Sequence, residues 1–294
     1  MQGMRSTGRT GTSVLERAFS LLEVLGSDGT SIGLAELARR AGLPKATAYR
    51  LANQLIDLHV LERAGQEYQL GLKLFELGNS VARQRELREA ALPFMEDLYE
   101  ATHETIHFGV LDDIEVLYVE KIAGRRKCTV PTTLGSRKPL YCTGLGKAIL
   151  AYSTPQLVEA VIQNGLPRCT RYTITDPHRL ELELTRAAET GVAYDREEYE
   201  LGITCVGSPL LNRAGRAWAA ISVTGPTTRF HPERTAAAVR TAALGLTRVL
   251  TKTNQSGWGA IGLGPAFHDH VSAADVLADS ASAPTCRNMV ARSK

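Results

Sequence analysis

The sequence predicts an α+β protein, within the broad α/β class: an N-terminal winged helix-turn-helix, a linker helix, and a C-terminal domain built on an antiparallel sheet. Two amphipathic helical segments meet at a glycine turn near the N-terminus, a short hairpin follows, and hairpin-connected strands then alternate with helices. The 294 residues are enough for two domains. We expect a flexible arm over 1–12, the winged helix-turn-helix over 13–71, the linker helix over 72–88, the sheet domain over 89–251 and a disordered tail over 252–294.

The helix-turn-helix is predicted from apolar spacing and from residues that start and stop helices. A short helix covers Leu34 to Ala41, Gly42 allows a sharp turn, and Pro44 opens a second helix that runs to about Leu58. A buried stripe is expected on the second helix at Ala48, Leu51, Leu55 and Leu58. This arrangement is typical of proteins that place the second helix in the major groove of DNA.

The segments on either side complete the winged fold. Ser13 and Glu16 form a capping box, which opens a preceding helix that Gly26 ends. Two short β-forming segments, 60–63 and 68–70, follow the second helix and are joined by a glycine-containing turn. A hairpin in this position is a wing.

The second helix carries hydrogen-bond donors on the face opposite its apolar stripe. Such donors suit phosphate oxygens and base edges, so we expect this face to bind operator DNA. The alternatives are a polar face that is merely solvated, or a helix-turn-helix that binds protein. The candidate DNA-binding residues are Arg39 and Arg40 before the turn, Lys45, Thr47, Tyr49, Arg50 and Asn53 on the helix, and Arg63 on the wing.

The linker and the second domain are predicted from a change in the spacing of apolar residues, from helical spacing to the alternation typical of strands. The segment from Gly71 to Gln84 has helical apolar spacing and is either a dimer seam or an ordinary core helix. Beyond it, 105–111 and 115–120 alternate as strands around an Asp-Asp turn. Further strands are expected over 128–133, 192–194, 204–211 and 217–224. Helices are expected through 92–99 and ending near His103, within 139–151 after a turn at Gly144 and Gly146, from Thr154-Pro155, over 178–190 and over 232–250.

Several motifs in order resemble the IclR family of bacterial regulators, from Ser13 to about Thr251. They are LPKATAYRLANQL (43–55), ETIHFGVLDDIEVLYVEK (104–121), LGSRKPLYCTGLGKAILA (134–151) and GVAYDREEYELGITCVGSPLLNRAGRAWAAISVTGP (191–226). The resemblance implies a GAF-like effector domain and a homodimer or homotetramer on palindromic double-stranded DNA. It also implies a regulator, more often a repressor, that is switched by a small carboxylate or aromatic acid, with no cofactor.

The resemblance places the effector site on the second domain, at Gly144, Leu145, Gly146, Asp195, Cys205, Ser222 and Thr224. A glycine turn entering a helix suits an anion, and two hydroxyls two residues apart share one face of a strand. As an anion, Asp195 would repel a carboxylate unless a donor offset it. The alternatives are hydroxyls facing solvent and Cys205 as a small core residue.

The sequence contains one catalytic motif that we do not expect to function. Residues 103–107 read HETIH, the zinc-protease pattern, which needs both imidazoles on one helical face. Here the β-forming Thr105 and Ile106 indicate a strand, in which residues four apart lie about 13 Å apart. We therefore expect neither an enzyme nor a metal site. A catalytic second domain, and redox sensing through Cys205 or Cys142, remain as alternatives.

The composition of the chain limits the classes of protein to which it can belong. With 44% hydrophobic and 22% charged residues the chain is globular, and its formal net charge of +3 is too small to indicate DNA binding alone. No run approaches the ~18 apolar residues of a membrane span, and no apolar core follows the basic N-terminus as in a secretory signal. The five scattered cysteines contain no CxxC pair. We expect a cytoplasmic protein without a membrane partner.

Overall fold

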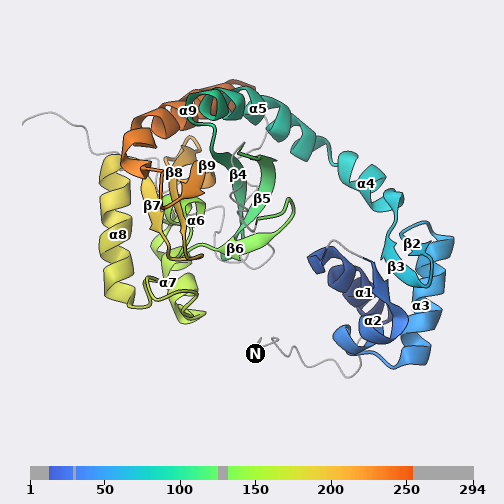
Figure 1. Cartoon of the computed structure of the whole chain (residues 1–294). Helices are drawn as coiled ribbons and strands as arrows, with labels where there is room; N and C mark the ends of the chain where they lie inside the picture. Colours follow the sequence, from blue (N-terminus) through green and yellow to red (C-terminus); the bar gives the residue numbers. More distant parts are fainter. Residues whose placement is uncertain (1–12, 29–30, 125–131, 254–294) are drawn as a thin grey trace, which may run out of the picture. The chain divides into compact units, whose positions relative to one another are not determined.

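The computed structural model describes residues 13–28, 31–124 and 132–253 (Figure 1). They form two compact units, divided between Glu86 and Leu87. The arm expected over 1–12 and residues 254–294 of the tail expected over 252–294 lie outside these ranges, whereas residues 252 and 253 belong to the last described helix and not to a tail. Most of the strand expected over 128–133 also lies outside them; its last two residues are not in a strand. Within the described ranges, no helix is both long and apolar enough to cross a membrane.

The N-terminal unit is the expected winged helix-turn-helix. It comprises α1 (Val14–Asp28), β1 (Ile32–Gly33), α2 (Leu34–Arg40), α3 (Lys45–Asp57), β2 (Leu61–Ala64) and β3 (Glu67–Leu70). The strands form an antiparallel sheet in the order β1-β3-β2, and the two-residue β1 was not among the predicted strands. The capping box is confirmed: Glu16 N–H donates to Ser13 Oγ (3.1 Å), and Ser13 N–H donates to Glu16 Oε2 (2.5 Å).

The turn between α2 and α3 depends on Gly42, whose φ of +64° lies in the left-handed region that favours glycine. Three of the four residues predicted for the buried stripe of α3 are buried. Leu58 is not: it follows the end of α3 and its side chain is 64% exposed. Ala52 is also buried in α3, in the same core cluster as Ala48, Leu51 and Leu55.

The segment predicted as one linker helix contains a break. The structure has α4 (Leu72–Asn79) and α5 (Ala82–Thr102), with Ser80 as the C-cap of α4. Ser80 Oγ–H donates to the Glu76 carbonyl (2.9 Å), and its N–H donates to the same carbonyl (3.1 Å). These bonds satisfy a carbonyl that the end of the helix leaves free.

The second unit is built on a six-stranded antiparallel sheet in the order β6-β5-β4-β9-β8-β7. Its strands are β4 (Thr105–Asp112), β5 (Glu115–Ile122), β6 (Arg137–Pro139), β7 (Ala193–Arg196), β8 (Ile203–Leu211) and β9 (Ala217–Pro226). The helices are the C-terminal part of α5, α6 (Gly144–Leu150), α7 (Pro155–Gln163), α8 (Pro177–Thr190) and α9 (Pro232–Thr253). The predicted α+β fold is confirmed.

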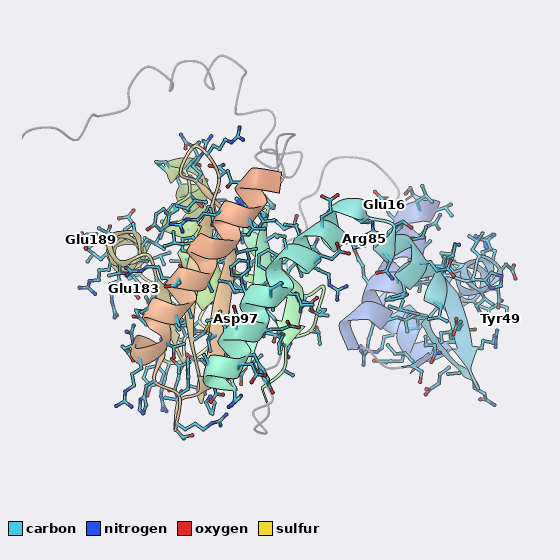
Figure 2. The ribbon with its side chains drawn as sticks, turned by 90° about the horizontal axis from the view of Figure 1, so that it is seen from above. Glu16, Tyr49, Arg85, Asp97, Glu183 and Glu189 are labelled. Atoms are coloured by element: carbon cyan, nitrogen blue, oxygen red, sulfur yellow. The ribbon has the colours of Figure 1, made fainter. Side chains whose placement is uncertain are left out.

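Two apolar cores cover the two faces of this sheet. Helices α5 and α9 lie side by side and bury Met95, Val239 and Leu246 against Phe108 and Ile221 (Figure 2). Helices α6, α7 and α8 form the second core. The central pairing of β4 with β9 sets His107 opposite Ser222, and β8 pairs Cys205 with Thr224. Residues more than 100 positions apart therefore meet at one place in the sheet.

Candidate functional site

The polar face of α3 is solvent-exposed. Lys45 begins the helix, and Tyr49 and Arg50 are exposed a little more than one turn later, with Tyr49 projecting outward (Figure 2). Thr47 is half-buried beside them. The face thus offers an ammonium, a guanidinium and two hydroxyls from the N-terminal half of one helix, the geometry used for reading a major groove.

The wing is joined to α3 through Arg63. Its guanidinium donates to Asn53 Oδ1 (3.1 Å) and to the Tyr68 hydroxyl (3.3 Å), and lies 5.1 Å from the Tyr68 ring centroid. Tyr68 is buried, so it holds the Arg63 side chain in place against the wing. Asn53 and Arg63, predicted from separate elements, are brought together.

The two arginines before the turn are paired with an acid. Glu36 accepts hydrogen bonds from Arg39 (2.6 and 2.8 Å) and from Arg40 (2.6 Å). These bonds lower the pKa of Glu36 to about 2, so it stays ionised. The three side chains together carry one net positive charge. The electrostatic attraction of this corner for a phosphate is therefore weaker than two arginines alone imply.

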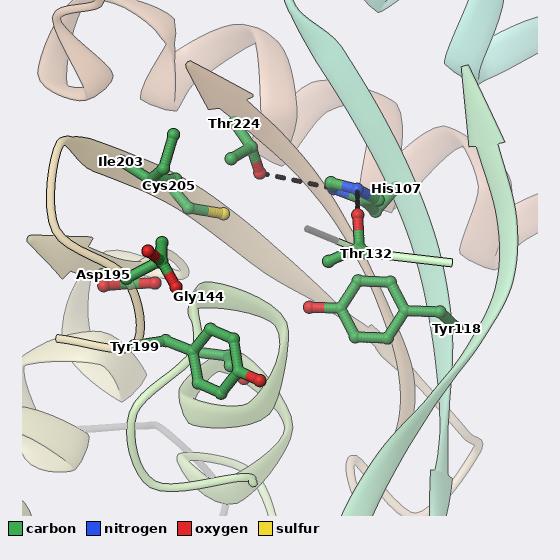
Figure 3. A pocket seen from close by; sticks show the side chains of 11 residues that line it. His107, Tyr118, Thr132, Gly144, Asp195, Tyr199, Ile203, Cys205 and Thr224 are labelled. Atoms are coloured by element: carbon green, nitrogen blue, oxygen red, sulfur yellow. Dashed lines mark hydrogen bonds between the residues drawn. The ribbon is translucent and has the colours of Figure 1, made fainter. Parts of the chain in front are cut away.

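A small cavity of about 30 Å³ lies in the second unit, between α6 and the centre of the sheet (Figure 3). The hydroxyl of Tyr118, the carboxyl of Asp195 and the thiol of Cys205 point towards the common space. Its lining comes from β4, β5, β7, β8, β9 and the loops beside them. The lining residues are His107, Tyr118, Thr132, Thr143, Gly144, Asp195, Tyr199, Glu200, Ile203, Cys205 and Thr224.

Two glycines allow this cavity to form. A Cβ on Gly207 would lie 2.5 Å from the Gly144 carbonyl oxygen, and a Cβ on Gly144 would lie 2.7 Å from Cys205 Sγ. Strand β8 therefore approaches the start of α6 backbone to backbone. Larger residues at either position would separate the elements that line the cavity.

His107 forms one wall as a buried, neutral imidazole. Burial, and secondarily the Lys121 ammonium, lower the pKa of His107 to about 3. Its Nε2 lies 2.7 Å from Thr132 Oγ1 and its Nδ1 lies 3.3 Å from Thr224 Oγ1. The ring packs edge-on against Tyr118, with centroids 5.1 Å apart.

Asp195 forms the opposite wall. Burial, followed by the Glu198 carboxylate, raises the pKa of Asp195 to about 7, while Lys147 and the backbone N–H groups of Glu198 and Tyr199 oppose the rise. Its Oδ1 accepts the Glu198 N–H at 2.8 Å. At this pKa the carboxyl is protonated in about half of the molecules at neutral pH, and the protonated form can donate a hydrogen bond, which lessens the expected repulsion of an acidic ligand.

The buried surroundings of Cys205 and Cys142 keep both thiols in the unreactive, protonated form. Burial raises the pKa of the Cys205 thiol to about 12, and burial also raises the pKa of Cys142. Both stay protonated at neutral pH, and the thiolate is the species that oxidants attack. This argues against redox sensing through either residue.

Four of the seven residues predicted for the effector site line the cavity: Gly144, Asp195, Cys205 and Thr224. Leu145 packs in the apolar core behind α6, and Gly146 faces Leu140 and Thr143. Ser222 lies next to the cavity on β9; its buried Oγ has no hydrogen-bond partner among the described residues.

Seven lining residues were not among those predicted for the effector site: His107, Tyr118, Thr132, Thr143, Tyr199, Glu200 and Ile203. His107 was considered only within the HETIH motif, and the structure confirms the strand predicted there. Helix α5 ends at Thr102, His103 has a φ of +54°, and β4 begins at Thr105. Glu104 is paired with Arg229 (2.8 and 3.1 Å). One signal in the sequence could have indicated part of the site: His107 and Tyr118 lie on two strands joined by a single turn, so they can face the same side of the sheet.

Comparison with known proteins identifies both units. The family profile described as IclR helix-turn-helix domain matches residues 14–65, and the one described as Bacterial transcriptional regulator IclR C-terminal matches residues 79–248. The HTH-type transcriptional regulator KdgR of Escherichia coli is 35% identical over 226 residues, which cover 76% of this chain and 85% of KdgR. The Transcriptional repressor IclR of the same organism is 29% identical over 225 residues, covering 75% and 82%.

A solved structure agrees. An IclR homolog from Microbacterium hydrocarbonoxydans, complexed with 4-hydroxybenzoate, superposes with a TM-score of 0.75 at 30% identity, covering 81% of this chain and 99% of that one. The relatives are transcriptional regulators and not enzymes. The chain belongs to the IclR family of bacterial transcriptional regulators.

Proposed function

We propose that this regulator is a repressor that releases its operator when a small carboxylate enters the cavity of the second unit. The observation that carries the proposal is a small cavity whose lining brings together hydroxyls, a neutral imidazole and a carboxyl with a pKa near neutral pH. Relatives named as repressors and the acid bound by the Microbacterium homolog support it.

The size of the cavity favours a small aliphatic acid over an aromatic one. Its volume is about 30 Å³, whereas an engineered cavity that binds benzene measures roughly 150 Å³. Even a small aliphatic acid would require lining side chains to move outward, and an aromatic acid would require the larger movement. Polar atoms on two opposite walls, at His107 and Asp195, further suit an acid that carries a second oxygen function.

For the DNA end, we propose that Lys45, Thr47, Tyr49 and Arg50 enter the major groove. Arg63 and Asn53 would contact the flanking backbone together, and Arg39 and Arg40 would reach phosphates once they exchange Glu36 for DNA. Specificity would then come from two recognition helices on a palindrome, since the net charge of +3 is small.

A homodimer is proposed from apolar side chains that the N-terminal unit leaves exposed. On α4 these are Leu72 (71% exposed) and Phe75 (69%), and on α1 Phe19 (61%). Large apolar side chains that are exposed in the isolated unit are candidates for burial against a second copy of the chain. A tetramer would need a further interface.

The test is footprinting on DNA upstream of its own gene and the neighbouring genes, repeated with a panel of acids. The panel contains lactate, pyruvate and 4-hydroxybenzoate. We expect a protected palindrome that is released by an aliphatic hydroxy- or oxo-acid more readily than by 4-hydroxybenzoate. Release by the aromatic acid alone would contradict the proposed ligand class, and protection without two-fold symmetry would contradict the dimer.

A further inference from the structure

A completely buried lysine lies behind the cavity wall. Lys147, on α6, has no exposed side-chain surface, and its Nζ lies 2.5 Å from Glu198 Oε1 and 3.7 Å from Glu183 Oε1. An ammonium removed from water is stable only when it is paired. Neither the sequence motifs nor the lining of the cavity assigns Lys147 a role.

Glu198 connects this lysine to Asp195. Its N–H donates to Asp195 Oδ1 (2.8 Å), and its carbonyl accepts hydrogen bonds from the hydroxyls of Thr170 and Thr173 (3.3 and 2.7 Å). The Glu198 Oε2 atom is buried and has no hydrogen-bond partner among the described residues. The loop is therefore fixed, with Glu198 between the cation and the cavity.

The count of buried charges is unequal. Asp195 and Glu198 are each buried, and Lys147 is the buried cation in contact with Glu198. Glu183 also approaches Lys147, but Arg186 (3.9 Å) and Arg196 (4.0 Å) share its carboxylate. Because Lys147 contacts Glu198 directly, Asp195 is the carboxyl left without a counter-ion, and a proton is most stable there.

The other groups around Asp195 do not supply the missing positive charge. They come from β4, β5, β8, the segment before α6 and the loop after β7. His107 is neutral, and the tyrosine and cysteine side chains are neutral or negative. The groups are His107, Tyr118, Cys205, Cys142, Tyr199 and the exposed Glu200.

We propose that the Lys147–Glu198 pair is a specificity-determining element of the effector site: it leaves the cavity-facing Asp195 protonated, so that Asp195 donates a hydrogen bond to an acidic ligand. The inference rests on the proposed function, because it assumes that the cavity is where the ligand binds. Lys147 and Glu198 act through Asp195 and do not line the cavity, so both are positioning residues.

The experiment titrates Asp195 in the ligand-free full-length protein. Aspartate carboxyl carbons are labelled with ¹³C, the Asp195 signal is assigned with Asp195→Asn, and spectra are recorded from about pH 4.5 to 8.5. We expect Glu198→Gln to lower the midpoint by at least ~1 pH unit, because Lys147 then faces Asp195 alone. We expect Lys147→Met to raise it by at least ~1 unit. Glu189→Gln, the same change at an exposed position of α8, is the matched control and leaves it unchanged.

The opposite signs separate the inference from a structural effect. Loosening of the fold would move the midpoint towards its ordinary value in both variants, and that result, or no shift, overturns the inference. Should Lys147→Met fail to fold, Lys147→Met/Glu198→Gln replaces it. Its midpoint lies above that of Glu198→Gln if Lys147 acts on Asp195, and equal midpoints overturn the inference.

The proposed function fails by a different result. If no acid in the panel binds a protein whose Asp195 titrates as expected, the cavity is not the effector site and the inference on specificity falls with it. If one of the acids binds, Glu198→Gln weakens its binding at neutral pH by about fivefold for a midpoint lowered by ~1 unit, because fewer molecules hold the proton on Asp195 and the ionised form repels the acid. Unchanged affinity, with the midpoint lowered, overturns the role in specificity alone.

Discussion

The polar face of α3 and the cavity of the second unit use side chains in opposite ways. The face of α3 is made by one helix, its donors are exposed, and its residues follow each other within three turns. The cavity is made by five strands and the loops beside them, its polar groups are buried, and the environment changes their ionisation. A surface site is therefore defined by local sequence, whereas a buried site is defined by the fold.

The largest expected effect is on the pH dependence of the free energy of unfolding, which tests whether burial sets the ionisation of Asp195 and His107. Asp195 has a raised pKa of about 7 against an ordinary 3.8, so it stabilises the fold below that ordinary value and this contribution is lost as the pH rises to 7. His107 has a lowered pKa of about 3 against 6.5, so its contribution is complete above 6.5 and is lost as the pH falls. Each slope is about 1 kcal/mol per pH unit.

Urea unfolding of the full chain at fixed concentration checks these signs. Relative to the parent, the free energy of unfolding of Asp195→Asn should rise with pH between the ordinary and the raised value. That of His107→Asn should fall with pH over its own window. Parallel curves for parent and variants would mean that neither group is as buried as the structure has it.

A second prediction concerns the backbone contact that shapes the cavity. Gly207→Ala places a methyl group 2.5 Å from the Gly144 carbonyl oxygen, so we expect a loss of about 1–3 kcal/mol in the free energy of unfolding. The control is Gly78→Ala, in α4, where a Cβ meets nothing within 4 Å. Alanine is the better helix former, so this variant should be as stable as the parent or more so. Equal effects would contradict the close approach.

A third prediction tests the exposed face. Arg50→Ala should weaken operator binding by ~1–3 kcal/mol and reduce discrimination between operator sequences, as expected for a contact to a base edge. Lys45→Ala should weaken binding evenly across sequences and flatten its dependence on salt. Mobility-shift titrations at several salt concentrations measure both. Parent-like affinity in both variants would show that another face meets the groove.

The smallest effect concerns the wing. Arg63→Ala and Asn53→Ala should each lower operator affinity, and the double variant should lose less than the sum, with a coupling under about 1 kcal/mol, because the two side chains share one hydrogen bond at the surface. Strict additivity would mean that they part when DNA binds.

The exposed face of α3 could be predicted from the sequence, whereas most of the buried cavity could not. The capping box at Ser13, the turn at Gly42 and the exposed donors of α3 depend on neighbours within a few positions, so they were visible in the chain. Thr224 and Cys205 were predicted for the site only from the family resemblance. His107 did not, because its role depends on pairing with β9, more than 100 residues away. Leu145 was misplaced because every residue of α6 is buried and its helical position does not reveal which side faces the cavity.

The wall formed by Thr132, His107 and Thr224 has a consequence for how the cavity receives a ligand. A neutral imidazole has a single N–H, so it donates to one threonine and accepts from the other. The threonine that accepts keeps its own O–H free for the cavity, and its counterpart presents only lone pairs. Moving the imidazole proton between the nitrogens exchanges these roles. The wall thus has two hydrogen-bond polarities at the same heavy-atom positions, and a ligand can select between them without displacing an atom other than hydrogen.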